Sequence, residues 1–107
     1  SLKTLLPVIK KWNVERGIVA LIKPQFEAGK KEVSRGDGVI RDPEVHRQVL
    51  LDVLTFAKNE GFGLLGLVKS SLLGPKGNAE FLVWLDMKPN DSIIEDLVNQ
   101  VLEIAPD

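Results

Sequence analysis

Residues 17–27 read Gly-Ile-Val-Ala-Leu-Ile-Lys-Pro-Gln-Phe-Glu, an apolar run that begins at a glycine and ends at a cation and a proline. An apolar run of this length, rich in β-branched residues, is typical of a strand buried on both faces of a sheet. Pro24 has no N–H to donate, so the hydrogen-bond ladder is expected to end there. Lys23 is therefore predicted at the point where the strand leaves the sheet.

Two interpretations of Lys23 follow from this position. In an open α/β sheet, ligands bind beyond the carboxyl ends of the parallel strands, so a lysine there is a candidate for chemistry or for holding an anion. The alternative is a solvated lysine that caps a strand. The strand alone favours the second interpretation.

The composition limits the classes of function that the chain can have. It holds 107 residues, of which 44% are hydrophobic and 27% charged, which is typical of one soluble globular domain. A formal net charge of −1 excludes nucleic-acid binding by charge alone. With no cysteine and one histidine, neither disulfides nor a closed zinc site is expected. No membrane-length apolar run or secretory leader is present, so we expect a cytoplasmic protein.

Helical patterns flank the strand on both sides. Residues 2–12 carry an apolar stripe at helical spacing. An Asp-Pro-Glu start predicts a helix over 43–60, with Gly61 as its C-cap. The last helix is predicted over 92–104, because Ser92 and the glutamate three residues later have capping-box spacing.

The segment between the first strand and the second helix, residues 27–41, is long, charged and contains glycines. One interpretation is a flexible surface loop whose charges nearly cancel. The other is a substrate lid over the end of the strand, because long loops in compact domains are usually functional or disordered. In that case its cations are candidates for substrate binding: Lys30, Lys31, Arg35 and Arg41. His46, in the next helix, is more typical of a surface or capping histidine than of a catalyst.

Two further strands are predicted at 62–70 and 79–86, with the pairing of the first around 63–69. The short connection between them makes them an antiparallel hairpin. Glu80 lies in an otherwise apolar run, where a carboxylate is costly to bury without a partner.

The order of the elements predicts an α/β fold in which these two charges meet. A right-handed crossover makes strand 62–70 parallel to strand 18–22. If strand 79–86 returns between them, its beginning lies beside the end of strand 18–22. Neighbouring strands are about 4.8 Å apart, so Glu80 and Lys23 would face each other at the carboxyl edge of the sheet. An ordinary cross-strand salt bridge would look the same.

Four segments follow one another along the chain in a recognisable order. They are Ser-Leu-Lys-Thr-Leu-Leu-Pro at 1–7, Ile-Lys-Pro-Gln-Phe-Glu-Ala-Gly at 22–29, Gly-Val-Ile-Arg-Asp-Pro-Glu-Val-His at 38–46 and Gly-Pro-Lys-Gly-Asn-Ala-Glu-Phe-Leu at 74–82. Together they resemble the carboxyl-terminal half of the TlyA, or hemolysin A, family of FtsJ-like RNA methyltransferases. The match covers nearly the whole chain. Ser71 departs from it, since the family commonly has proline there.

The resemblance implies a partial Rossmann-like methyltransferase sheet of three strands, the last antiparallel and inserted, with flanking helices. It also implies ribose 2′-O-methylation of ribosomal RNA with S-adenosylmethionine, by a Lys-Asp-Lys-Glu tetrad. Lys23 matches the second lysine and Glu80 the glutamate. The first lysine and the aspartate would precede Ser1, and no Gly-x-Gly cofactor turn follows a strand. Residues 1–107 are therefore expected to be half of a catalytic domain, inactive alone.

Two other classes of function remain as alternatives. One is a non-catalytic RNA-binding or structural domain. The other is a membrane-active hemolysin, as the family's older name suggests, but neither helix 43–60 nor helix 92–104 is a basic amphipathic helix. A half domain would expose the apolar edge of strand 18–22, so self-association is also expected.

Overall fold

The computed structural model describes residues 3, 6, 7, 10, 17–29 and 38–103. Within them the elements run in the order β1 (Ile18–Ile22), α2 (Pro24–Glu27), α4 (Pro43–Asn59), β2 (Gly63–Lys69), the 3-10 turn η1 (Pro75–Gly77), β3 (Phe81–Asp86) and α5 (Ile94–Val101).

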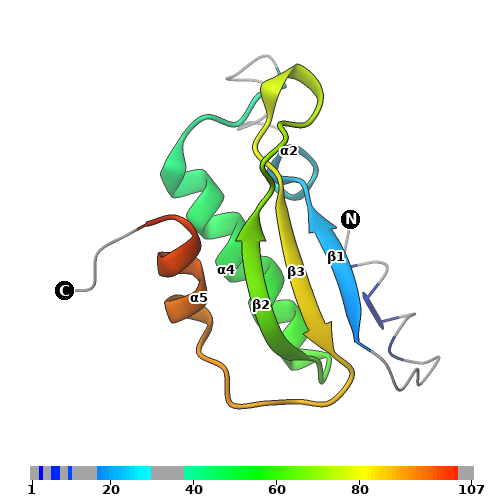
Figure 1. The fold of residues 1–107 in the computed structure, drawn as a ribbon. Helices are drawn as coiled ribbons and strands as arrows, with labels where there is room; N and C mark the ends of the chain where they lie inside the picture. The colour runs from blue at the N-terminus through cyan, green and yellow to red at the C-terminus, as the bar shows by residue number, and fades with distance from the viewer. Residues whose placement is uncertain (1–2, 4–5, 8–9, 11–16, 30–37, 104–107) are drawn as a thin grey trace.

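The three strands form one sheet in the order β1-β3-β2. Strand β3 is antiparallel to both neighbours, so β1 and β2 run in the same direction (Figure 1). Ile22 of β1 and Lys69 of β2 both pair with Phe81 of β3, which aligns the three strands across the sheet's upper edge in Figure 1. The predicted insertion of the last strand, and with it the mixed α/β fold class, is confirmed.

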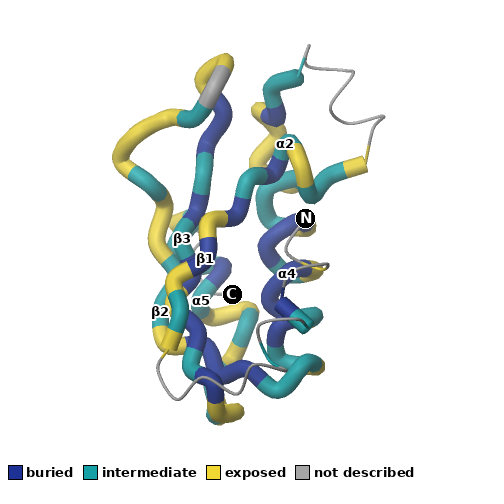
Figure 2. Tube along the Cα trace, turned by 90° about the vertical axis from the view of Figure 1, so that its right-hand side faces the viewer, coloured by how far each residue is buried: buried dark blue, intermediate teal, exposed yellow. Residues whose placement is uncertain are grey.

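Helix α4 packs along one face of the sheet, and the core lies between them (Figure 2). Along β3 every second residue is buried, because alternate side chains of a strand point to opposite faces. On β1 the side chains of Val19 and Leu21 are 66% and 39% exposed. The prediction that this strand is buried on both faces is therefore wrong for the described chain, since its helices cover only one face.

Helix α4 agrees closely with its sequence pattern. Asp42 is the N-cap, and its Oδ1 accepts a hydrogen bond of 2.9 Å from the Glu44 N–H. The helix ends at Asn59 with Glu60 as its C-cap, so the predicted boundary is one residue too late. Gly61 follows with a φ of +93°, the left-handed conformation that glycine adopts at low cost.

Helix α5 begins two residues later than its sequence pattern predicted. Its N-cap is Ile93, and no side chain caps it. Ser92 instead donates its hydroxyl to Asn90 Oδ1 over 2.7 Å. The Asn90 side chain also pairs with both backbone groups of Leu64, at 3.1 and 2.9 Å, and this holds the segment against β2. The expected capping box is wrong because Asn90 takes the serine hydroxyl.

Most of the predicted helix over 2–12 lies outside the described residues. Of its described part, Leu6 is buried in the core as its apolar stripe predicted. None of the helices in the described part of the chain has the length and apolar content needed to cross a membrane.

Candidate active site

Lys23 lies at the junction between β1 and a single helical turn. Its backbone is extended, with φ −111° and ψ 102°, and it is the N-cap of α2. The Lys23 carbonyl accepts hydrogen bonds from the N–H groups of Phe26 and Glu27, at 2.9 and 3.2 Å. Sequence reasoning predicted that Pro24 ends the strand but missed α2, although proline at the first helical position is a recognised helix start.

Glu80 meets Lys23 at the same edge of the sheet. The Lys23 Nζ lies 3.8 Å from Glu80 Oε2, and the two side chains are 34% and 12% exposed. The predicted juxtaposition is therefore present. The separation is an ion-pair distance that is too long for a hydrogen bond. On the backbone side, the Ser70 N–H donates to the Glu80 carbonyl over 2.8 Å and so fixes the start of β3 against the end of β2.

The Glu80 carboxylate lies directly on the backbone of Gly74. A Cβ atom built at Gly74 would stand 2.2 Å from Glu80 Oε2 and 2.6 Å from its Cδ, well inside contact distance. Any larger residue at 74 must displace the carboxylate. Oε2 is also fully buried and accepts no hydrogen bond from the described residues. A buried acceptor left in this way costs about 1–3 kcal/mol, so the site holds a carboxylate that a hydroxyl or ammonium donor would stabilise.

Asn78 joins the turn before Glu80 to the end of the long loop. Its side chain is almost fully buried, at 2% exposure. Its Oδ1 accepts from the Ile40 N–H over 2.9 Å, and its Nδ2 donates to the Gly38 carbonyl over 2.8 Å. The Gly74 N–H donates to the Asn78 carbonyl over 2.8 Å, which closes the turn itself. Asn78 and Gly74 thus position Glu80, and sequence reasoning assigned neither of them a role.

A second group of basic side chains lies on the helix side of the same edge. A hollow of about 360 Å³ there is lined by Arg41, Pro43, His46, Lys69, Val101, Leu102 and Glu103. Of the four predicted substrate-binding cations, the structure brings Arg41 into this hollow. Lys30, Lys31 and Arg35 lie outside the described residues.

His46 contributes no full positive charge to this hollow at neutral pH. Burial lowers the pKa of His46 below its ordinary value of 6.5, and the nearby charge of Lys69 lowers it further. The hydrogen bond with the Ile40 carbonyl and the charge of Asp42 act in the opposite direction. The bond between His46 Nε2 and that carbonyl is 2.9 Å long, so the nitrogen carries the proton. This is a structural histidine, in line with the interpretation that the sequence favoured.

Most of the chain, including this edge of the sheet, matches the model of a known family. The model of the FtsJ-like methyltransferase family matches residues 1–87, which include Lys23 and Glu80. The chain belongs to the FtsJ-like methyltransferase family.

Individual relatives agree with this family. The chain is 43% identical over 110 residues to a Bacillus subtilis (strain 168) protein provisionally named rRNA methyltransferase YqxC, and covers 39% of it. It is 35% identical over 111 residues to the Mycobacterium tuberculosis (strain CDC 1551 / Oshkosh) 16S/23S rRNA (cytidine-2′-O)-methyltransferase TlyA, and covers 41% of it. These alignments take in 98% and 99% of this chain, which spans about two fifths of either relative.

A solved structure shows the same fold. The structure of a protein from Streptococcus thermophilus, provisionally titled a hemolysin, superposes with a TM-score of 0.81 at 37% identity. The superposition covers 97% of this chain and 39% of the Streptococcus thermophilus chain.

FtsJ-like methyltransferases in general use S-adenosylmethionine as the methyl donor. A nucleoside-containing cofactor in a Rossmann-like sheet binds over a glycine-rich turn between a strand and a helix. Here β1 is followed by Lys-Pro-Gln-Phe and β2 by Ser-Ser-Leu-Leu. Neither of these stretches contains a glycine, so the described residues do not fit the donor. Nor do they include a group of three or more His, Asp or Glu side chains that could hold a metal ion.

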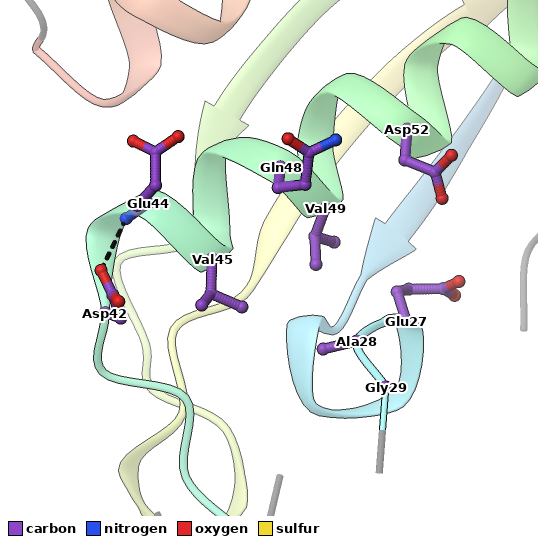
Figure 3. Close-up of a pocket in the computed structure, with 9 residues that line it drawn as sticks. All are labelled: Glu27, Ala28, Gly29, Asp42, Glu44, Val45, Gln48, Val49 and Asp52. Carbon is purple, nitrogen blue, oxygen red and sulfur yellow. Dashed lines mark hydrogen bonds between the residues drawn. The ribbon is translucent and has the colours of Figure 1, made fainter. Parts of the chain in front are cut away.

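A separate hollow of about 470 Å³ lies between α2 and α4 (Figure 3). Its walls carry four carboxylates, Glu27, Asp42, Glu44 and Asp52, beside the apolar side chains of Val45 and Val49. Asp52 is paired with Lys3 at 2.6 Å, and Asp42 is occupied as the cap of α4. An acidic surface repels phosphate, so this hollow is unsuited to a nucleic-acid backbone.

Proposed function

We propose that this chain supplies the acceptor-side residues of an S-adenosylmethionine-dependent ribose 2′-O-methyltransferase that acts on ribosomal RNA. The observation that carries the proposal is the pair of Lys23 and Glu80 at the carboxyl edge of a methyltransferase-type sheet. The names of two relatives include rRNA methyltransferase. A protein with this substrate would work in the cytoplasm.

The residue types suit the acceptor's chemistry. A ribose hydroxyl is a poor nucleophile and must be oriented and deprotonated as it reacts. A lysine amine in its neutral form, placed beside the hydroxyl, can accept that proton as the oxygen attacks the methyl group, and general acid–base help of this kind is worth about 10²–10⁴-fold in rate. Glu80 holds the lysine in place from 3.8 Å, and its buried Oε2 has capacity for a further donor. Both side chains thus act on the ribose and not on the methyl donor.

The basic residues of the long loop would bind the RNA backbone. Arg41 lies beside Lys69 in the hollow at the site's edge, and we propose the same role for Lys30, Lys31 and Arg35. A small set of cations suits a protein whose net charge is −1, because it concentrates attraction for phosphate at the reacting edge.

We also propose that residues 1–107 form the carboxyl-terminal half of the catalytic domain. The chain spans about two fifths of its relatives, and its described strands end in turns that do not fit the donor. The isolated chain is then expected to show no methyl transfer. Turnover by the isolated chain with labelled donor and ribosomal RNA would contradict this.

The test of the proposed function is methyl transfer from labelled donor to ribosomal RNA by the full-length protein. Lys23→Met and Glu80→Gln remove the two proposed groups, and each is expected to lower the rate constant by about 10²-fold or more. Lys88→Met and Glu95→Gln are matched controls, because both residues are exposed and lie away from this edge.

The outcomes separate the candidate functions. An enzyme loses activity with Lys23→Met and keeps it with Lys88→Met. A non-catalytic RNA-binding domain tolerates both changes at the site. Full activity of the Lys23→Met variant would therefore overturn the proposal.

A further inference from the structure

Phe26 is an aromatic side chain that the structure leaves uncovered beside the candidate active site. Its ring is 68% exposed, although exposing a large apolar side chain gains nothing in the free monomer. Among the described residues the other exposed aromatic is Trp84, at 53%, whose β3 position pairs with Val19 on the open sheet face. Phe26 is instead on α2, at the end of the sheet where Lys23 and Glu80 meet.

The backbone holds this ring in a defined position relative to Lys23. The Phe26 N–H donates to the Lys23 carbonyl over 2.9 Å, and the buried Pro24 anchors the turn. The Lys23 Nζ consequently lies 5.6 Å from the centroid of the Phe26 ring, within the range of a cation–π contact. The same ammonium is 3.8 Å from Glu80 Oε2. One lysine therefore connects the exposed ring to the carboxylate.

The connection between β2 and β3 adds apolar surface at the same end of the molecule (Figure 1). Leu72 and Leu73 of that connection are 77% and 64% exposed. An ion pair with exposed apolar side chains around it suits a ligand that presents both a polar hydroxyl and a flat, weakly polar surface.

We propose that Phe26 is a stacking platform for a nucleobase of the RNA substrate, either the base of the methylated nucleotide or that of its direct neighbour. This inference rests on the proposed function, because it takes the ribose hydroxyl to lie at Lys23. The base is joined to that ribose by a single bond, so it must lie close to the lysine. Unpaired bases are bound in this way by stacking on aromatic side chains, whatever their sequence.

Phe26 and Lys23 are proposed to contribute to different steps, Phe26 to RNA binding and Lys23 to proton transfer. Phe26 carries no group that could move a proton, so it acts on binding and on the orientation of the ribose. Stacking of one base on an aromatic ring is worth about 1–3 kcal/mol, equivalent to roughly 5- to 150-fold in affinity. Loss of the ring should therefore raise the KM for ribosomal RNA by an amount in that range.

The experiment compares Phe26→Ala, Phe26→Trp and Ile93→Ala in the full-length protein. Ile93 is the matched control, since it is 61% exposed and lies at the start of α5. Two quantities are measured: the KM for ribosomal RNA, and the fluorescence of a single-stranded RNA that carries 2-aminopurine, whose emission falls when the base stacks. Phe26→Ala should raise the KM about 5- to 150-fold and abolish the quenching. Phe26→Trp should retain both, and Ile93→Ala should change neither.

The outcomes also distinguish this inference from the proposed function. If Lys23→Met abolishes methylation while Phe26→Ala leaves KM and quenching unchanged, the platform is wrong and the proposed function stands. If Lys23→Met is fully active, the proposed function fails first. A loss of thermal stability in Phe26→Ala, with unchanged quenching, would mean that the ring packs on protein and not on RNA, and would equally overturn the platform.

Discussion

The described part of the chain contains two lysine–phenylalanine pairs, and they differ in what surrounds them. Lys10 Nζ is 5.2 Å from the centroid of Phe62, and Lys23 Nζ is 5.6 Å from that of Phe26. Phe62 is fully buried, and the Lys10 ammonium donates hydrogen bonds to the carbonyls of Gly61 and Met87. The ring of Phe26 is exposed, and the Lys23 ammonium donates no hydrogen bond to any of the described residues.

The difference shows how the same two residue types serve different purposes. At Lys10 the ammonium donates to two partly buried backbone oxygens, which contributes to stability. At Lys23 the charge faces one carboxylate at ion-pair distance, and the ring has a free face. The first pair is expected to matter for folding and the second for activity. Four experiments test this contrast.

The largest difference in the free energy of unfolding is expected between variants that remove one or the other of the two rings. Phe62→Ala leaves a cavity in the core and should lower the free energy of unfolding by about 3–5 kcal/mol. Phe26→Ala removes an exposed ring and should change it by about 0.5 kcal/mol at most. Urea denaturation of both variants measures the two values. Equal losses would remove the contrast.

Substitutions of the two lysines should differ by a smaller amount in the free energy of unfolding that they cost. Lys10→Met leaves two carbonyls without their charged donor, which should cost about 1–3 kcal/mol of stability while the activity of the folded protein is unchanged. Lys23→Met breaks a partly exposed ion pair and should cost about 0–1 kcal/mol. The same denaturation measurement checks the predicted changes in stability, and a methylation assay checks the predicted effects on activity. A Lys10→Met protein that is fully stable but inactive would reverse the assignment.

A third experiment moves Glu80 away from Lys23 without changing either residue. Gly74→Ala places a Cβ atom where the carboxylate now lies, and the side chain of Glu80 must turn away. Activity should fall about tenfold, the equivalent of ~1.4 kcal/mol, with the fold retained. Gly77→Ala is the steric control because nothing lies within 4 Å of a Cβ there, although its φ of +84° predicts some backbone strain. If Gly74→Ala methylates normally, the position of Glu80 has no role in catalysis.

The smallest effect concerns a third basic residue beside a phenylalanine. The ring of His46 meets that of Phe81 edge-on, with centroids 5.8 Å apart. Burial lowers its pKa in the folded state, so below pH 6.5 the unfolded chain binds a proton that the folded chain does not. The stability that His46 contributes is therefore complete above pH 6.5 and declines as the pH falls below it. His46→Gln should reduce this acid-side decline in denaturation measured from pH 7 to pH 5, and an unchanged slope would contradict the assignment.

The features that the sequence predicted are those set by pattern and topology. Loop length and crossover handedness predicted the strand directions, and the family resemblance implied that β3 lies between β1 and β2, a placement that brings Glu80 to Lys23. The start of α4 followed from local capping at Asp42. In each case the deciding interaction either joins residues that are close in sequence or is common to all sheets of this type.

The features that the sequence did not predict depend on contacts between distant segments. Asn78 appears in the sequence as a turn residue, and its role appears only when Ile40 lies beside it. Gly74 matters because a carboxylate six residues later folds back onto it. Likewise, the capping box predicted at Ser92 does not form, because the Ser92 hydroxyl donates to Asn90. The Asn90 side chain is in turn held by the backbone of Leu64, which is distant in sequence.

The bonds of Asn78 have one more consequence. They join Asn78 to Ile40 and Gly38, which lie 38 and 40 positions earlier in the chain. The Ile40 amide is therefore protected from solvent only while the turn that carries Glu80 is intact. Its exchange with deuterium would therefore report each transient opening of the turn that supports Glu80.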